Sequence, residues 1–312
     1  MSKIIVSGSI AYDRIMDYAG NFTDSLVADK LHALSVSFQV ERIKEEFGGC
    51  AGNLAYNLLL LGEQPSIIAT AGSDFGRYAD YLEQKGIRTS SIRIDRGDLT
   101  SVAHIVTDQA NNQIAAFALA SGGKPYGELP ETKGVACAIL GAGCVADTEA
   151  LAAHAKGNSL IYYVDPGQAI PMLSADALCA TIAGSAGLFA NDYEIGMIES
   201  KTGWKEQELL EKTSFVVITL GAKGSRVLTK EKTIEIRAVP VGDVVDPTGA
   251  GDAHRAGFVK GILSGFSLEQ SGKLASAVAA YAVEKKGTQN HFFTRDELKA
   301  RYEAAYGEQI GL

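Results

Sequence analysis

Several features that define other classes of protein are scarce in this sequence. Cysteine occurs only four times in 312 residues, at Cys50, Cys137, Cys144 and Cys179, and never with Cys-x-x-Cys spacing. A disulfide framework is therefore not expected, and buried reduced thiols of this kind are typical of cytoplasmic proteins. No apolar run approaches the length of a membrane span, and the first residues lead straight into a predicted strand rather than a signal peptide. We expect no membrane partner.

Positive charge and two common nucleotide signatures are missing as well. The formal net charge of −8 argues against a nucleic-acid partner. It does not exclude a small phosphate-bearing ligand, which a local anion site with Mg²⁺ can hold. The Walker A pattern Gly-x-x-x-x-Gly-Lys-Ser/Thr is absent, and no Gly-x-Gly-x-x-Gly follows the first predicted strand. The second absence counts against a dinucleotide-binding oxidoreductase.

Short apolar runs alternate with longer helical patterns along the chain. Because the runs are apolar on both faces, they predict parallel strands covered by helices on each side. The predicted strands are Ile4–Ser7, Ser66–Thr70, Cys137–Leu140, Leu160–Val164, Leu188–Ala190 and Phe215–Thr219. Small or polar residues follow each of them, at the strand ends where open α/β sheets bind ligands. The pattern predicts an α/β fold: a three-layer, doubly wound, mostly parallel sheet.

Two segments depart from this rhythm and predict half-buried antiparallel strands. Residues 34–40 alternate, with Leu34, Val36, Phe38 and Val40 on one face. Residues 102–107 and 113–118 predict a hairpin around a polar turn. Such strands fit a small β layer that projects from the main sheet, although ordinary surface hairpins remain an alternative.

The most informative segment is residues 246–252, Asp-Pro-Thr-Gly-Ala-Gly-Asp. A valine-rich stretch at 239–245 predicts a strand before it, and apolar residues at helical spacing predict a helix after it. Glycines at the start of that helix leave backbone N–H groups unshielded, and with the helix dipole they form an anion site. The Asp252 carboxylate can accept a hydroxyl proton while those groups hold developing phosphoryl charge. The alternative is an ordinary glycine-rich turn capped by aspartate.

Three further segments carry residues suited to ligand binding. Phe47-Gly48-Gly49-Cys50-Ala51-Gly52-Asn53 opens a predicted helix, where the glycines allow close backbone approach and the amide can bind hydroxyls. Asn191 and Glu194 follow a strand and offer hard oxygen ligands, although the same spacing is typical of a helix cap. Residues 219–225, Thr-Leu-Gly-Ala-Lys-Gly-Ser, form either a phosphate-facing loop or a tight hairpin turn.

The string at 246–252 resembles the C-terminal signature of the ribokinase-like (PfkB) family of small-molecule kinases. Phe47–Asn53 resembles the family's Gly-Gly-x-x-x-Asn signature, and matching segments follow in family order from Gly8 to about Asn290. The resemblance implies a kinase that transfers the γ-phosphoryl group of ATP to the primary hydroxyl of a nucleoside or sugar. It also implies one ribokinase-like domain over residues 1–312, with a lid formed by inserted segments at about 13–46 and 98–122.

The resemblance also implies roles for individual residues. Asp252 takes the hydroxyl proton, and the anion site consists of the N–H groups of Gly249, Ala250 and Gly251. Substrate contacts fall to Asp13, Gly48, Gly49, Asn53 and the lid aromatics Phe38 and Phe117. Nucleotide contacts fall to Asn191, Thr219, Gly221, Lys223, Gly224 and Asn290. Mg²⁺ is assigned to Asn191 and Glu194, and a monovalent cation such as K⁺ to Asp246 and Thr248.

The acceptor is left open between a nucleoside and a sugar. Ribokinases carry a glutamate after the mid-chain strand, where this chain has Gly141-Ala142-Gly143-Cys144. The lid phenylalanines could instead cover a flat base, so the chain looks most similar to bacterial and archaeal nucleoside or adenosine kinases. The alternatives are a sugar kinase for ribose, fructose or a related furanose, and a catalytically silent nucleoside-binding protein. His254 stands where the family commonly has phenylalanine. An exposed, alternating lid also predicts a homodimer.

Overall fold

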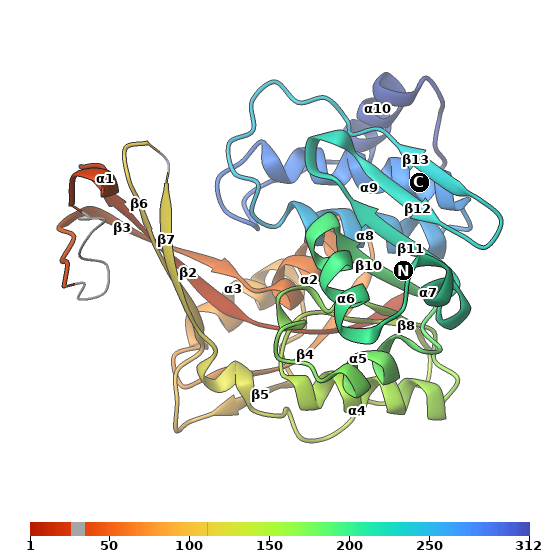
Figure 1. The fold of residues 1–312 in the computed structure, drawn as a ribbon, viewed down its shortest axis with the longest axis horizontal. Helices are drawn as coiled ribbons and strands as arrows, with labels where there is room; N and C mark the ends of the chain where they lie inside the picture. The colour runs from red at the N-terminus through yellow and green to blue at the C-terminus, as the bar shows by residue number, and fades with distance from the viewer. Residues whose placement is uncertain (26–34, 111) are drawn as a thin grey trace.

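The main body is built on a nine-stranded sheet with helices on both faces (Figure 1). The computed structural model describes residues 1–25, 35–110 and 112–312. In sheet order, the strands are β13 (Thr233–Ile236), β12 (Ser225–Leu228), β11 (Val216–Thr219), β10 (Gly187–Asn191), β9 (Tyr162–Val164), β8 (Val135–Leu140), β1 (Lys3–Ser7), β4 (Gln64–Gly72) and β5 (Ile92–Asp95). The strands from β11 to β5 are parallel, and β12 runs antiparallel to both its neighbours.

Each central strand sends alternate side chains into two hydrophobic cores. In β1, Ile4 and Val6 belong to one core and Ile5 to the other. The first core lies under α2 (Cys50–Leu60), α3 (Gly76–Lys85), α8 (Ala250–Leu263), α9 (Leu268–Val283) and α10 (Arg295–Tyr306). The second lies under α4 (Val145–Gly157), α5 (Ala175–Ile182), α6 (Asp192–Thr202) and α7 (Glu206–Lys212). The predicted three-layer, doubly wound fold is confirmed.

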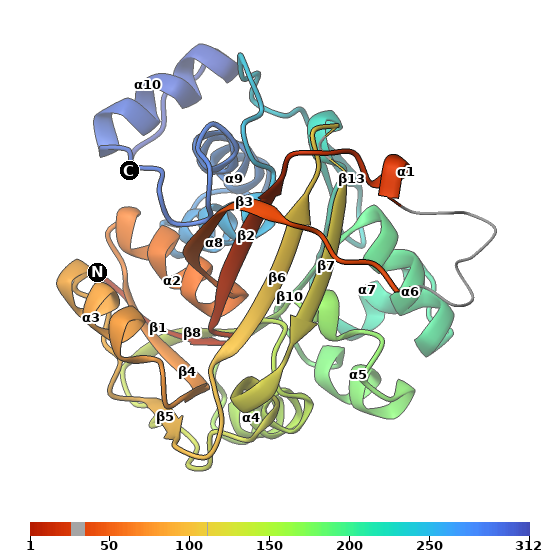
Figure 2. The ribbon, with the colours of Figure 1, turned by 90° about the vertical axis from the view of Figure 1, so that its left-hand side faces the viewer.

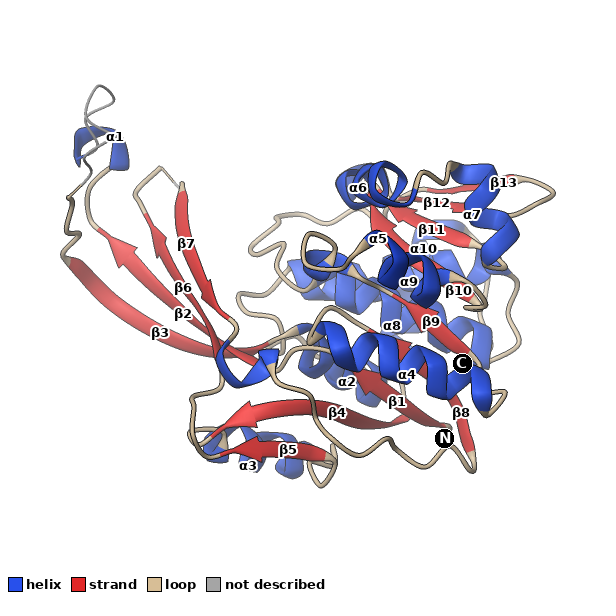
Figure 3. Cartoon of the chain, turned by 60° about the horizontal axis from the view of Figure 1, so that its bottom comes forward, coloured by secondary structure: helices blue, strands red, loops and turns tan. Residues whose placement is uncertain are grey.

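A separate four-stranded sheet forms the lid and projects from the main body (Figures 1 and 3). Its order is β3 (Val40–Gly48), β2 (Ala11–Tyr18), β6 (Ser101–Thr107) and β7 (Gln113–Ala118). The short helix α1 (Phe22–Ser25) lies at its outer end, and Figure 2 looks onto the sheet. The β6–β7 pair is the hairpin expected from the alternating pattern.

The six predicted strands of the main sheet correspond to β1, β4, β8, β9, β10 and β11, with shifts at their ends. One strand is shorter than predicted: β9 begins at Tyr162, so Leu160 and Ile161 precede the strand. The side chain of Ile161 is 54% exposed, which explains why apolar character alone placed the boundary too early.

Two predicted strands are wrong. Residues 239–245 form no strand before α8, and Val244 and Val245 are exposed. Pro240 and Gly242 interrupt this segment, and valine content does not overcome them. Residues 35–39 are also irregular, because β2 ends at Tyr18 opposite Val40 and offers them no partner strand. Leu34 lies outside the described residues.

Among the described helices, each is too short or too polar to span a bilayer.

Candidate active site

The start of helix α8 carries the three backbone amides that the sequence assigns to an anion site. Gly249 is the N-cap residue with φ 77°, and an added Cβ would lie 2.9 Å from Cβ of Thr288. The N–H of Ala250 donates to the carbonyl of Pro247 at 3.2 Å. The N–H groups of Gly249 and Gly251 have no acceptor among the described residues. Two of the three predicted amides are therefore free to bind an anion, and that of Ala250 is engaged within its own turn.

Asp252 lies in the first turn of α8, beside those amides. Its Oδ2 accepts a hydrogen bond of 2.8 Å from Nδ2 of Asn53 in α2. Burial raises the pKa of Asp252, while the positive charge of Arg255 and the bond from Asn53 oppose that rise. The arrangement brings together the two side chains that the sequence analysis assigned to proton transfer and to substrate binding.

Arg255 joins three carboxylates around this turn. Its Nε lies 2.6 Å from Oδ2 of Asp165, in an ion pair that is close but not aligned as a hydrogen bond. Its Nη1 lies 3.8 Å from Oδ1 of Asp252, and its Nη2 lies 3.8 Å from Oε2 of Glu194. Burial raises the pKa of Asp165 to about 7, against the lowering effect of Arg255. One guanidinium therefore offsets part of a concentrated negative charge.

The sequence analysis gave Arg255 and Asp165 no role. Both left a signal in the sequence: Asp165 directly follows a buried strand, and Arg255 stands one helical turn after Asp252.

The predicted substrate residues Asp13, Gly48 and Gly49 lie where the lid strands β2 and β3 meet helix α2. Asp13 in β2 is so close to Gly48 that an added Cβ there would lie 2.5 Å from its Oδ2. The pKa of Asp13 is raised to about 6, chiefly by burial. The negative charges of Asp246, Asp252 and Glu46 raise it further. Gly49, with φ 83°, is the N-cap residue of α2, and an added Cβ would lie 2.5 Å from the carbonyl oxygen of Ser9. Only glycine fits there.

Asn191 and Glu194 form a capping box at the start of α6. Oδ1 of Asn191 accepts from the N–H of Glu194 at 2.8 Å, and Oε2 of Glu194 accepts from the N–H of Asn191 at 2.8 Å. The cap that the sequence left as an alternative is therefore present. Within the described part of the chain, no three acidic, histidine or cysteine side chains converge to hold a metal ion.

Thr219 and the following glycines form the turn between β11 and β12. Thr219 ends β11 opposite Ser225, with its Oγ1 3.5 Å from the carbonyl oxygen of Ala190. At Gly224, with φ 96°, an added Cβ would collide with the carbonyl oxygen of Ile236. The hairpin geometry is present, and the turn lies at the carboxyl end of β11.

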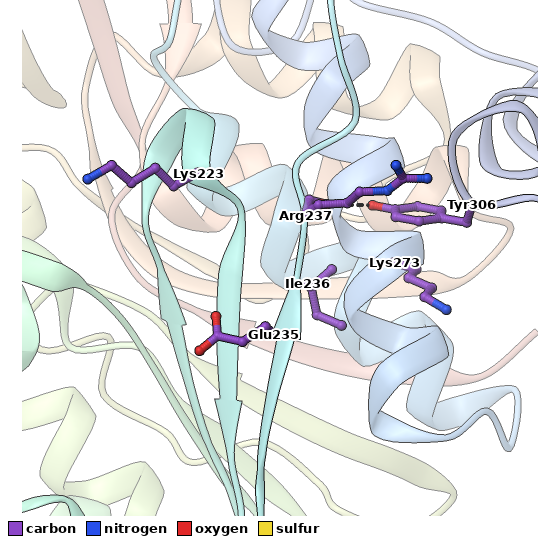
Figure 4. A pocket seen from close by; sticks show the side chains of 6 residues that line it. All are labelled: Lys223, Glu235, Ile236, Arg237, Lys273 and Tyr306. Atoms are coloured by element: carbon purple, nitrogen blue, oxygen red, sulfur yellow. Dashed lines mark hydrogen bonds between the residues drawn. The ribbon is translucent and has the colours of Figure 1, made fainter.

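Lys223, at the tip of this turn, also lines a cavity of about 420 Å³. The other lining residues are Glu235, Ile236, Arg237, Lys273 and Tyr306. Figure 4 shows Lys223 extending away from Arg237 and Tyr306. The hydroxyl of Tyr306 donates a hydrogen bond to the main-chain carbonyl of Arg237. Lys273 is already paired with Glu269 and Glu308, so this cavity is not a cluster of free cations.

The segment after α9 connects the 246–252 motif to the lid. Asp246 accepts from the N–H of Thr248 at 2.9 Å and from the N–H of Gly287 at 3.0 Å. Asn290, predicted to contact the nucleotide, donates through Nδ2 to Oε2 of Glu46 at 2.9 Å. The predicted cation residues Asp246 and Thr248 are therefore linked by hydrogen bonds to the segment that carries the predicted nucleotide residue Asn290.

The two lid phenylalanines differ in their surroundings. Phe38 packs against Tyr18 and Phe22, with ring centroids 5.0 and 5.1 Å away. Phe117 in β7 is 51% exposed. The structure does not bring them together with Asp252, Asn53 and Asp13 through any contact among the described residues.

His254 packs behind the anion site. It is buried, stacks on Phe258 at 6.4 Å, and neither ring nitrogen has a hydrogen-bond partner among the described residues. Burial, with the nearby charge of Arg255, lowers its pKa to about 3. The histidine is thus a neutral packing residue at a position where a phenylalanine ring would fit.

Comparison with known proteins decides the family. Residues 1–295 match the family described as pfkB family carbohydrate kinase. The chain belongs to this family. As a PfkB kinase it is a phosphotransferase, and Asp252 with the amides at the start of α8 lies in the segment that resembles the family's C-terminal signature.

Relatives of this PfkB kinase include nucleoside kinases. The nucleoside kinase of Methanocaldococcus jannaschii is 33% identical over 306 residues, which cover 97% of each chain. Its solved structure superposes with a TM-score of 0.88, covering 97% of this chain and 99% of that one. The Burkholderia thailandensis nucleoside kinase in complex with inosine has a TM-score of 0.87 at 32% identity, covering 98% of this chain and 100% of that one.

Proposed function

We propose that this kinase transfers the γ-phosphoryl group of ATP to the primary hydroxyl of a nucleoside, with adenosine as the first candidate. One observation carries the proposal: Asp252, held by Asn53, stands beside the free amides of Gly249 and Gly251. The nucleoside kinases among the relatives support the acceptor class, and the B. thailandensis complexes with inosine and with ADP-inosine support a purine nucleoside.

In the proposed reaction, the acceptor hydroxyl lies between Asp252 and the transferred phosphoryl group. Asp13 binds sugar hydroxyls from the lid side. Asp252 takes the proton as the acceptor oxygen bonds to the γ-phosphorus, while the bond from that phosphorus to the bridging oxygen breaks and ADP leaves. The amides of Gly249 and Gly251 stabilise the charge that develops on the phosphoryl oxygens. An aspartate is a weak base, but phosphoryl transfer depends mostly on positioning and electrostatics.

The residues around Arg255 fit a hard cation such as Mg²⁺. Among the described residues, Oδ1 of Asp165 is buried without a hydrogen-bond partner. An added Cβ on Gly167 would lie 3.6 Å from it and 3.9 Å from Oε1 of Glu194. These oxygens are of the kind that binds Mg²⁺ directly or through water. Glu194 and Asn191 are the proposed holders, and the ion would neutralise ATP phosphate charge. The monovalent-cation role of Asp246 and Thr248 remains a proposal.

A sugar kinase is the second candidate. The family description names carbohydrate kinases, and a ribokinase of Haemophilus influenzae is 28% identical over 270 residues. A coupled ADP-release assay with adenosine, inosine, other nucleosides, ribose and fructose separates the candidates. Turnover with nucleosides supports the proposal, and turnover with sugars alone overturns the acceptor assignment. No turnover with any of them favours the silent nucleoside-binding protein.

The base assignment has its own test. Asp252→Asn should lower kcat by roughly 10²–10⁴ while leaving ATP affinity nearly unchanged, because the amide keeps the shape but cannot take a proton. Asp296→Asn is the control, since its carboxylate on α10 is 97% exposed. Retained turnover in Asp252→Asn would refute the assignment.

We also propose that the chain is one domain whose lid segments, at about 13–46 and 98–122, pair with a second copy. The edge strand β7 is exposed along its whole length, and Ile114 and Phe117 on it are 41% and 51% exposed. An open, apolar edge of this kind favours strand pairing with another chain. The four free cysteines support a reducing compartment, so we place the protein in the cytoplasm.

A further inference from the structure

A chain of buried hydrogen bonds runs from Asp252 to the inner end of the lid. Asn53 Nδ2 donates to Asp252 at 2.8 Å, and Oδ1 of the same amide accepts from Nε2 of Gln289 at 3.0 Å. The same Nε2 lies 2.6 Å from the hydroxyl of Tyr78, which donates to the carbonyl of Gly48 at 2.9 Å. Gln289, Tyr78 and Asn53 are 4%, 0% and 4% exposed, so water does not compete for these bonds.

The two ends of this chain determine the direction of every bond in it. The Gly48 carbonyl can only accept, so Tyr78 must donate to it and accept from Gln289. An ionised Asp252 can only accept, so Asn53 must turn Nδ2 toward it and Oδ1 toward Gln289. Both conditions require that Gln289 present its NH₂ group. A side chain at position 289 without two donors cannot satisfy both neighbours.

The surrounding residues hold Gln289 in this position. The hydroxyl of Tyr81 donates to the main-chain carbonyl of Gln289 at 3.1 Å, and Thr288 Oγ1 donates to the main-chain carbonyl of Phe47 at 3.0 Å. At Gly52, an added Cβ would lie 2.0 Å from the Tyr78 hydroxyl and 3.0 Å from Nε2 of Gln289. Glycine at position 52 therefore makes room for the chain.

We propose that Gln289 is a positioning residue for phosphoryl transfer: it orients the Asn53 amide toward the Asp252 carboxylate and ties that carboxylate to the end of lid strand β3. The inference rests on the proposed role of Asp252 as the base. Gln289 is buried and acts through its hydrogen bond to Asn53. Because Nδ2 of Asn53 favours the ionised carboxylate, loss of the orienting bond should impair the chemical step more than binding.

Gln289→Met is the main test, because methionine has nearly the same length and shape but no donors. Oε1 of Gln289 has no hydrogen-bond partner among the described residues, so the substitution also removes an unsatisfied buried atom and should preserve the fold. We expect kcat for the nucleoside to fall roughly 10-fold, with KM for nucleoside and ATP changed by less than about 3-fold.

Tyr56→Phe is the matched control. The Tyr56 hydroxyl is buried and donates to the His291 carbonyl, in the same connecting segment but outside the chain to Asp252. It should lower the unfolding midpoint without changing kcat. An equal loss of kcat in both variants would mean that Gln289 only stabilises the segment, and would overturn the proposal.

Two further variants decide the remaining outcomes. Adding Gln289→Met to Asn53→Ala should have no further effect on kcat, because Gln289 acts through Asn53. Should Gln289→Met fail to fold, Tyr78→Phe serves instead, with its ring still packed on Phe47 and Phe75 and an expected loss of kcat of about 3-fold. A folded variant with unchanged kcat overturns the inference. Activity in Asp252→Asn would refute the proposed base instead, so the two failures are distinguishable.

Discussion

Asp252 combines two opposing environments in one side chain. Burial raises its pKa, whereas Arg255 and the Asn53 amide favour the ionised form. The neighbouring Asp13 and Asp165 have pKa values raised to about 6 and about 7, again chiefly by burial. The residue-scale consequence is that several acids of the site titrate closer to neutrality than an ordinary aspartate, at about 4.

Activity should therefore fall on acidification at a higher pH than an ordinary aspartate would give. The proposed base must be ionised, so kcat/KM should decline as the pH is lowered through the raised pKa of Asp252. A pH profile of kcat/KM from about 8 to about 4.5 measures this. A flat profile over that range would contradict the raised pKa.

Asp13 affects the stability of the fold with the opposite dependence on pH. Because its pKa is raised in the native state, its contribution to stability is present below pH 3.8 and is lost as the pH rises through about 6.

The buried His254 gives a second residue-scale prediction. Its pKa is lowered to about 3, so the unfolded chain binds a proton below pH 6.5 that the native state refuses. Its contribution to stability is present above pH 6.5 and is lost as the pH falls toward 3. His254→Phe should remove this loss and preserve the stacking on Phe258.

Urea unfolding of both proteins at two pH values tests the prediction. The free-energy advantage of His254→Phe should be about 2 kcal/mol larger at pH 5 than at pH 7.5, from about 1.4 kcal/mol per pH unit. If the free-energy advantage of His254→Phe were the same at both pH values, His254 would be protonated at pH 5 in the native state as it is in the unfolded chain.

At the scale of elements, the bend between β3 and α2 places the inner end of the lid beside the helix that carries Asn53. Gly48 ends β3 and Gly49 begins α2 with φ 83°, and the N–H of Ala51 donates to the carbonyl of Ser9 at 3.0 Å. This bend passes the connection between β1 and β2 so closely that a side chain at Gly49 would strike the backbone of residues 9–11. The helix that carries Asn53 is thereby fixed relative to Asp13.

Gly49→Ala should therefore destabilise the protein and raise KM for the acceptor. Its Cβ would lie 2.5 Å from the Ser9 carbonyl oxygen and 2.7 Å from the Ala11 nitrogen, in addition to the strain of a positive φ. Gly86→Ala is the control, with φ 88° and nothing within 4 Å of the added Cβ. We expect about 1 kcal/mol of destabilisation in Gly86→Ala and more than about 3 kcal/mol in Gly49→Ala. Equal unfolding midpoints would contradict the predicted clash.

At the scale of the whole molecule, the lid sheet ends in an edge strand, β7, that is fully exposed. The main sheet is covered by helices on both faces, whereas β7 exposes every residue from Gln113 to Ala118. The lid reaches the site through β2 and β3, which carry Asp13 and Gly48. A second copy that paired with the lid edge would therefore also affect how the acceptor is enclosed.

Ile114→Lys should convert the proposed dimer to a monomer, because it adds charge to the exposed strand. Sedimentation velocity at several protein concentrations measures the state directly. Met172→Lys is the control, since Met172 is 54% exposed on the main body and should leave the oligomeric state unchanged. A wild-type protein that sediments as a monomer at all concentrations would refute the lid-mediated dimer.

Part of this protein follows from the sequence because local patterns are sufficient. Short runs that are apolar on both faces are typical of buried parallel strands, so the parallel sheet and its order of elements were predictable. The 246–252 string predicts its own helix start because the glycines and the acid act within one turn. The segment at 35–39 shows the limit, since alternation predicts a strand only where a partner strand exists.

Tertiary structure alone decided which distant residues share the site. Asn53 and Asp252 are far apart in sequence, as are Gln289 and Tyr78, yet each pair is hydrogen-bonded. The three carboxylates around Arg255 come from the residue after β9, from the first turn of α6 and from α8, which meet only when the sheet is assembled. A sequence pattern reports the periodicity of apolar and polar residues within one segment. Burial, pKa and the direction of a hydrogen bond depend on neighbours from other segments, and those are set by packing.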